Sequence, residues 1–191
     1  WLIEALPAGG RIGFDPWLHT LAEIERLTLA VARRQLTLKA VPANLIDRVW
    51  GEARPATPAS PVIVQPLAHA GVSGADKLAA LQKRLKEESQ DAVVLTLPDS
   101  ICWLFNIRGA DVAHNPVTLA FAIVPAKGKA ELFIDAAKIT PAVAQHLAPL
   151  ARVQPPKDLV PRLKALKAEG RKVRLDPETA AFAIARALGK T

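Results

Sequence analysis

The sequence predicts an α/β fold. Segments with apolar residues at the helical spacing alternate with short runs rich in Val, Ile and Leu, and this order appears on both sides of a proline-rich stretch. Two junctions have a similar pattern, since a short strand ends in Asp15-Pro16 and another in Asp176-Pro177. The repetition favours two domains of one architecture.

The first strand is predicted over 11–16. Residues 17–35 carry apolar side chains every three or four positions, which predicts a helix, and 36–41 read as a second strand. A strand, a helix and a strand within about 30 residues form a βαβ unit and imply a parallel sheet. A short helical turn over 44–50 follows, capped by Asn44.

The stretch 51–66 contains four prolines among Ala, Thr and Ser, a composition that excludes a helix and favours an extended segment. We interpret it as a domain boundary, with a first domain over 1–52, a linker over 53–68 and a second domain over 69–191. The alternative is a long surface loop within one domain.

The second half is again mixed. A helix over 76–88 is expected to begin at a cap formed by Ser73 or Asp76, and Gly128 marks the turn of a hairpin. The other predicted elements are strands over 91–97, 117–125, 129–135 and 171–175, a helical turn over 100–106, and helices over 140–147, 159–168 and 178–188.

Composition narrows the class of protein. Half of the 191 residues are hydrophobic and 23% are charged, which excludes a disordered chain, and no apolar run reaches the roughly 18 residues of a membrane span. The net charge of +7 is spread over several helices without interleaved aromatic residues, so no nucleic-acid partner is expected. The single cysteine, Cys102, lies in an apolar run, which indicates a reducing compartment and an unreactive thiol. We therefore expect a soluble cytoplasmic protein.

No complete set of catalytic residues is visible. The four histidines show no metal-ligand spacing, and neither a phosphate-binding glycine loop nor a GxSxG elbow occurs. The prediction is therefore no catalytic residue, no metal ligand and no cofactor within this chain, as in a domain that supports another.

One segment, 106–116, places polar residues and glycine between two apolar runs. The residues of interest are Arg108, Asp111, His114 and Asn115. They either belong to a binding loop at the ends of strands or form a structural loop with an Arg108–Asp111 ion pair and a histidine hydrogen bond. Gly109 is expected to permit a positive φ angle.

The run WLFNIRGADVAHNP at 103–116 resembles the matching segment of the long, three-domain Xaa-Pro aminopeptidases, also called aminopeptidase P. Further similar segments follow the same order along the chain: IGFDPWLHT at 12–20, VPANLIDRVW at 41–50, GVSGADKLAALQKRL at 71–85, AFAIV at 120–124 and ELFID at 131–135. Together they cover most of residues 10–135.

The resemblance implies two creatinase N-terminal-like domains, each a mixed, mainly parallel sheet flanked by helices. This chain would hold the second half of the first and nearly all of the second. It also implies a catalytic domain beyond Thr191 that binds two divalent metal ions, usually manganese, through two Asp, one His and two Glu. Such enzymes are typically homodimers and release the residue that precedes proline in peptides.

By this resemblance, the chain would be the non-catalytic N-terminal region of such an enzyme, shaping substrate access and oligomer contacts. Arg108, Asp111, His114 and Asn115 would lie near the substrate. The start at Trp1 and the lack of methionine favour a part of a longer chain. The alternative is a free-standing creatinase-N-like binding or regulatory module without enzyme activity. A creatine or proline dipeptide hydrolase is disfavoured, because those enzymes lack the additional N-terminal domain.

Overall fold

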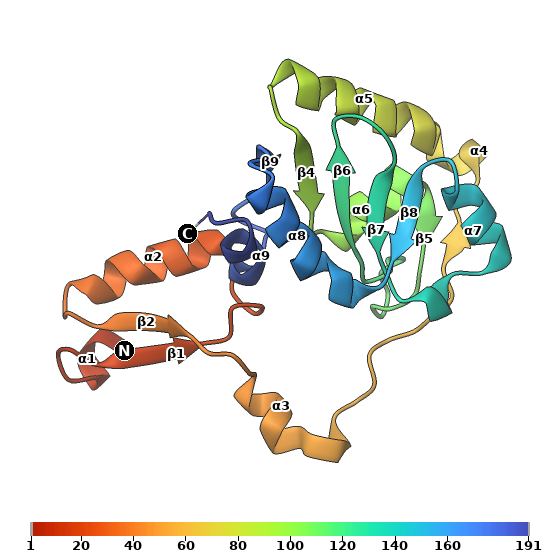
Figure 1. Ribbon diagram of the computed structural model, residues 1–191. Helices are drawn as coiled ribbons and strands as arrows, with labels where there is room; N and C mark the ends of the chain where they lie inside the picture. The colour runs from red at the N-terminus through yellow and green to blue at the C-terminus, as the bar shows by residue number, and fades with distance from the viewer. Residues whose placement is uncertain (1, 191) are drawn as a thin grey trace. The chain divides into compact units, whose positions relative to one another are not determined.

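The computed structural model describes residues 2–190 (Figure 1). The chain divides into two compact units: residues up to Ala56 pack with those from Pro177 onward, and Thr57–Asp176 form the second unit. The residues from Pro177 onward, which the sequence analysis places in the second domain (69–191), pack with the first unit. Residues 57–68, which it places in the linker, belong to the second unit.

The first unit contains a parallel two-stranded sheet. Its elements are α1 (Leu2–Ala5), β1 (Arg11–Phe14), α2 (Leu21–Ala32), β2 (Thr37–Ala40), α3 (Leu45–Trp50), the 3-10 turn η1 (Gly51–Ala53) and α9 (Phe182–Ala187). The predicted βαβ unit is confirmed, since β1 pairs in parallel with β2. Helix α2 begins four residues later than predicted, because the Thr20 side chain and Glu23 form a capping box that fixes its start.

Helix α9 completes this first unit. The backbone N–H of Leu21 donates to the Ala180 carbonyl at 3.0 Å, and the Phe14 and Phe182 rings meet edge to face with centroids 5.3 Å apart. Only 182–187 are helical, so the predicted helix over 178–188 is shorter than expected, because Ala181 instead forms a β-bridge with Thr20.

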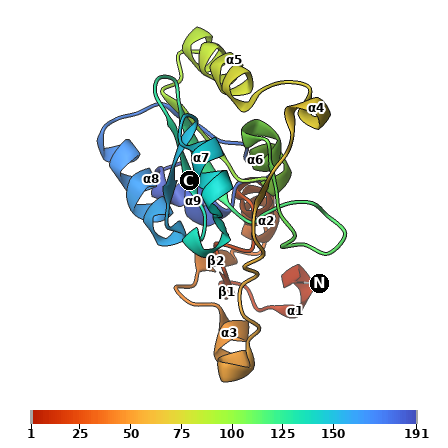
Figure 2. The same ribbon diagram turned by 90° about the vertical axis from the view of Figure 1, so that its right-hand side faces the viewer.

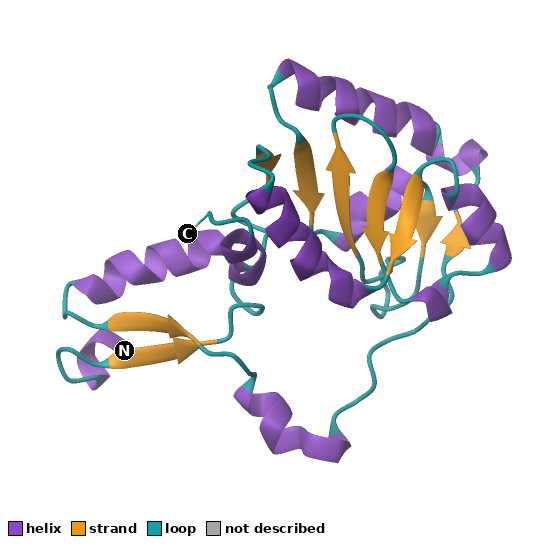
Figure 3. Ribbon diagram, in the orientation of Figure 1, coloured by secondary structure: helices purple, strands orange, loops and turns teal. Residues whose placement is uncertain are grey.

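The second unit is built on a mixed five-stranded sheet with the order β8-β7-β6-β4-β9 (Figure 3). The α/β fold class is confirmed. The elements of this unit are β3 (Ile63–Val64), α4 (Leu67–Ala70), α5 (Gly74–Glu87), β4 (Ala92–Leu95), α6 (Pro98–Phe105), β5 (Ile107–Arg108), β6 (Phe121–Pro125), β7 (Ala130–Phe133), η2 (Ala136–Lys138), α7 (Pro141–Leu147), β8 (Ala151–Gln154), η3 (Pro156–Asp158), α8 (Leu159–Ala168) and β9 (Val173–Arg174).

Helices cover both faces of this sheet. Strand residues alternate between faces, and Val93, Ala122 and Leu132 belong to the buried cluster that also contains side chains of α5, α6 and α7. Val94 and Ile123 point to the other face. Figure 2 shows α8 on one side of the sheet and α5 and α6 on the opposite side. Both faces are therefore protected from solvent.

Candidate functional site

The predicted segment 106–116 begins where α6 ends. Asn106 caps this helix in the left-handed conformation, with φ 50°. Its side-chain amide donates to the Val72 carbonyl at 2.9 Å, and its Oδ1 accepts from Lys77 Nζ at 2.7 Å. The chain then passes through β5, which pairs antiparallel with β3, and continues as a loop over 109–120 into β6.

The strand register places the end of this loop at one edge of the sheet. Leu95 at the end of β4 pairs with Ala122 near the start of β6, and Phe133 at the end of β7 pairs with Phe121. The loop therefore meets the carboxyl ends of β4 and β7. A pocket of about 500 Å³ lies at this edge, and its lining includes Thr96, Leu119, Phe133, Asp135, Lys138 and Pro156.

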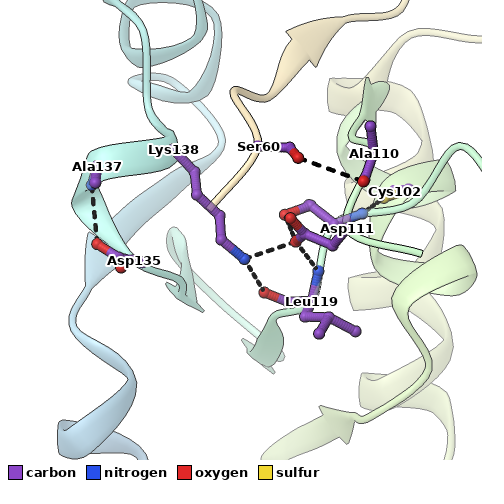
Figure 4. Close-up of polar contacts among 9 residues, drawn as sticks. Ser60, Cys102, Ala110, Asp111, Leu119, Asp135, Ala137 and Lys138 are labelled. Carbon is purple, nitrogen blue, oxygen red and sulfur yellow. Dashed lines mark hydrogen bonds and ion pairs between the residues drawn. The ribbon is translucent and has the colours of Figure 1, made fainter. Parts of the chain in front are cut away.

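Asp111 is the most highly connected of the four predicted site residues. Its Oδ2 accepts from Lys138 Nζ at 2.6 Å, from the Thr118 hydroxyl at 2.9 Å and from the Leu119 backbone N–H at 2.7 Å (Figure 4). The Asp111 and Lys138 side chains are 0% and 3% exposed. Burial by itself raises the pKa of Asp111, but the three donors outweigh it and hold that pKa below its ordinary value.

The second carboxylate oxygen of Asp111 has a different environment. Oδ1 is buried and has no hydrogen-bond partner among the described residues. The neighbouring Ala110 carbonyl accepts from the Ser60 hydroxyl at 3.3 Å, which ties the loop to the segment before β3. The carboxylate therefore has one saturated and one unused oxygen.

Arg108 does not pair with Asp111, so the ion pair considered from the sequence is wrong. Its guanidinium donates instead to the backbone carbonyls of Cys102, at 3.2 Å, and Ile107, at 2.8 Å. Lys138 takes the expected place of Arg108 beside the carboxylate. Arg108 is half-buried and binds one carbonyl in the last turn of α6 and one in β5.

His114 and Asn115 form the exposed tip of the loop. Asn115 donates its backbone N–H to the Val112 carbonyl at 3.1 Å, which closes a tight turn with His114 at its corner, and His114 has a φ of 60°. The four predicted residues therefore lie on one loop in different environments. Asp111 is buried inside its base, Arg108 lies half-buried at its start, and His114 and Asn115 face solvent.

Gly109 is required for close approach rather than for a positive φ. A Cβ at this position would lie 2.7 Å from Thr118 Cβ and 3.0 Å from the Thr118 backbone. The positive φ angles of this region belong instead to Asn106 and His114, so the expectation for Gly109 was wrong. Only glycine lets the two sides of the loop lie this close together.

The cysteine expected to be unreactive is buried. Cys102 is 2% exposed, and its Sγ accepts the Thr118 backbone N–H at 3.5 Å. Burial raises the pKa of the Cys102 thiol. This thiol therefore belongs to the packing beneath the loop.

Sequence reasoning missed two lysines. Lys138 lies distant in sequence from Asp111, so only the fold brings the two together. Lys77 is 6% exposed, donates to the Trp103 carbonyl at 2.9 Å, and places its ammonium 4.3 Å from the centroid of the Trp103 ring. Burial first, and then the charge of Arg108, lower the pKa of Lys77. For Lys77, the sequence offers one sign of burial, which is its position on the apolar side of the predicted helix over 76–88.

No group of three or more His, Cys, Asp or Glu side chains within residues 2–190 is arranged to hold a metal ion. In the same part of the chain, no helix combines the length and apolar character required to cross a bilayer.

A known domain family matches most of this sequence. The sequence profile of the creatinase/prolidase N-terminal domain matches residues 53–191. The chain belongs to this family.

Two relatives of this creatinase/prolidase N-terminal chain are named as aminopeptidases P. A protein of Coccidioides posadasii named "Probable Xaa-Pro aminopeptidase P" is 40% identical over 166 residues, which are 87% of this chain and 25% of that protein. Aminopeptidase P2 of Arabidopsis thaliana is 33% identical over 186 residues, or 96% of this chain and 26% of the relative. This creatinase/prolidase N-terminal chain thus spans about a quarter of the length of these relatives.

A solved structure is similar to the entire creatinase/prolidase N-terminal chain. The crystal structure of X-prolyl aminopeptidase from Caenorhabditis elegans, described as a cytosolic enzyme with a di-nuclear active site, aligns with a TM-score of 0.89 and 29% identity. The alignment covers 100% of this chain and 32% of the nematode chain. The resemblance read from WLFNIRGADVAHNP is therefore confirmed.

Proposed function

We propose that this chain is the non-catalytic N-terminal region of a metal-dependent Xaa-Pro aminopeptidase, a hydrolase that removes the residue preceding proline. The observation that carries the proposal is the similarity of the entire chain to about a third of X-prolyl aminopeptidase. The parent enzyme would be a cytoplasmic homodimer that acts on proline-containing peptides.

We propose that the metal ions of this reaction are bound outside residues 2–190. The described residues offer no cluster of carboxylates and imidazoles that fits two divalent ions, so we assign no chemical step to this chain. Two ions, manganese in our proposal, would be held by the remainder of the parent enzyme, where they would activate water for attack on the prolyl amide.

The division of the chain into two creatinase-N-like domains remains part of the proposal. In support, the part of the first unit that the structure describes has two parallel strands, whereas parallel sheets are normally larger and covered on both faces. This unit would be the C-terminal part of a first domain whose other strands come from elsewhere in the parent protein.

Within this role, we propose that the loop over 109–120 shapes substrate access. Two features support it. The Asp111–Lys138 pair fixes the base of the loop, and the tip exposes His114 and Asn115. A buried ion pair beneath an exposed polar tip holds the tip in one geometry, as a group facing a substrate requires.

A paired assay tests the proposed function. We expect the full-length parent, supplied with divalent metal, to hydrolyse an Xaa-Pro peptide, and residues 1–191 alone to leave it intact. Hydrolysis by the purified 1–191 chain, in a preparation free of other peptidases, would contradict the proposal, as would an inactive full-length protein.

A second experiment tests the loop. In the full-length enzyme, His114→Ala and Asn115→Ala should lower kcat/KM for Xaa-Pro peptides without lowering Tm, because both side chains are exposed. The matched control is Lys127→Ala, at the exposed turn between β6 and β7 on the opposite edge of the sheet. Arg108→Ala should also lower kcat/KM, whereas a purely structural Arg108 would lower Tm alone.

A further inference from the structure

Helix α3 is a six-residue helix that presents apolar side chains to solvent. None of its residues is buried, and Leu45, Ile46, Val49 and Trp50 are exposed, Val49 to 85%. A helix this short is not stable in water by its own hydrogen bonds. Four exposed apolar side chains on one short element are typical of a surface that another part of a protein covers.

The position of α3 within the first unit is fixed by Asp15 and Asn44. Asp15 Oδ1 accepts the Trp17 backbone N–H at 2.8 Å, and Asp15 Oδ2 accepts the Asn44 side-chain amide at 2.8 Å. Asn44 Oδ1 in turn accepts the backbone N–H groups of Ile46 and Asp47 at the start of α3. One carboxylate therefore joins the turn that carries Trp17 to the helix that carries Trp50.

Between these two tryptophans lies a groove of about 600 Å³. Its apolar lining includes Trp17, Leu18, Ile46 and Trp50. Its charged lining is Asp15, Asp47, Arg54 and Arg186, of which Arg54 pairs with Asp47 at 3.0 Å. Trp17 is 44% exposed and Trp50 is 50% exposed. Tryptophan and arginine are the residues most enriched at the energetic centres of protein interfaces.

We propose that this groove and α3 form the docking surface for the polypeptide that follows residue 191 in the parent enzyme. The inference rests on the proposed function, because it takes this chain to be part of a longer protein. The relatives leave room for such a segment, since the chain covers only about a quarter of their length.

The chain path favours this occupant over a second copy of the chain. Arg186 lines the groove from α9, and α9 ends at Ala187, one residue later. A following segment therefore starts beside the groove, and a short connection gives it a high effective concentration there. The exposed Arg186 at the start of that connection suits a partner surface with an apolar centre and a carboxylate at its rim.

The substitution Val49→Ala in the full-length enzyme separates docking from simple exposure. Val49 contributes nothing to the core of the first unit, and alanine is the better helix former. If α3 were free, its amides would exchange with deuterium more slowly in the Val49→Ala variant. If α3 is docked, the lost contact should make them exchange faster, by about three- to tenfold.

Hydrogen exchange of residues 45–50 is therefore the measurement, with Leu67→Ala as the matched control. Leu67 is exposed to 57% on another short helix, outside the first unit, and its substitution should leave α3 exchange unchanged. We expect the protection of α3 in the wild-type enzyme to be the same at tenfold different protein concentrations. Slower exchange in Val49→Ala, or protection that grows with concentration, would overturn the proposal, the latter in favour of a second copy.

The assay also keeps the two proposals apart. A full-length protein that protects α3 but leaves Xaa-Pro peptides intact would reject the proposed function and retain the docking surface. An active enzyme with an unprotected α3 would do the reverse.

Discussion

Lys138 Nζ lies 2.6 Å from Asp111 Oδ2, and neither side chain is more than 3% exposed. The pair joins the turn after β7 to the loop that leads into β6, and the same carboxylate also binds Thr118 and Leu119. It is thus the main polar contact that determines the conformation of the candidate loop.

Removing one partner of this pair should be costly. Lys138→Met leaves the Asp111 carboxylate buried without its cation, which costs about 3–5 kcal/mol of unfolding free energy. Urea denaturation at neutral pH measures the effect. The control is Lys83→Met, since Lys83 pairs with Glu87 at 3.8 Å in a solvent-exposed position and should lose less than about 1 kcal/mol. Equal losses in the two variants would contradict the importance of the buried pair.

Acid should weaken the same contact. The pKa of Asp111 in the folded protein is lower than its ordinary value, which is about 3.9 in an unfolded chain. The stabilisation is therefore complete above about pH 5 and is lost as the pH falls through the folded-state pKa. The difference in unfolding free energy between the wild type and Asp111→Asn should be constant near neutral pH and shrink below about pH 4. A difference that does not change with pH would show that the carboxylate charge contributes nothing.

Gly109→Ala should disturb the base of the loop by about 1–3 kcal/mol, because the new methyl group would overlap Thr118. Thr118 also donates its backbone N–H to Cys102 Sγ, so displacement of Thr118 should expose the thiol and speed its reaction with a thiol reagent. Gly128→Ala serves as the control: it adds strain at φ +98° without a steric contact, and should leave the thiol rate unchanged. Equal thiol rates in the two variants would contradict the steric role of Gly109.

Asn106→Ala should remove a polar anchor beneath the loop. Lys77 would lose its side-chain acceptor while its ammonium remains buried, at a cost of about 2–4 kcal/mol by thermal or urea unfolding. Gln35 has a similar φ of 57° but is exposed, so Gln35→Ala controls for the left-handed backbone and should change stability by less than about 0.5 kcal/mol. A comparably small effect of Asn106→Ala would contradict the role of Asn106, because the Trp103 carbonyl would then suffice as the acceptor for Lys77.

Local signals in the sequence predicted most of the fold. The helical spacing around Leu78 and Leu85, the capping residue Ser73 and the dense apolar run at 92–95 led to α5 and β4 close to their observed bounds. The short strands β3, β5 and β8 were missed, β5 because it is only two residues long. β3 lies in a proline-rich segment, and β8 is a four-residue edge strand with two exposed positions, so neither carries an alternating pattern long enough to identify.

The start of β6 shows why the boundaries failed. Residues 117–120 look like a strand by composition, but the backbone N–H of Leu119 donates to Asp111 rather than to a neighbouring strand. A contact between distant side chains and backbone overrides local preference here. The same limit explains the site: the loop was identified from its polar composition, whereas Lys138, its main partner, is identifiable only after the strands have been paired.

The return of α9 to the first unit has a consequence for how the protein is made. The second unit is continuous in sequence, from Thr57 to Asp176, whereas the first needs Phe14 beside Phe182. A ribosome emits all of the second unit before it emits α9, an interval on the order of ten seconds at usual elongation rates. During that interval Phe14 lacks its Phe182 partner and the Leu21 backbone N–H lacks the Ala180 carbonyl, so the first unit reaches its described packing only after α9 has been synthesised.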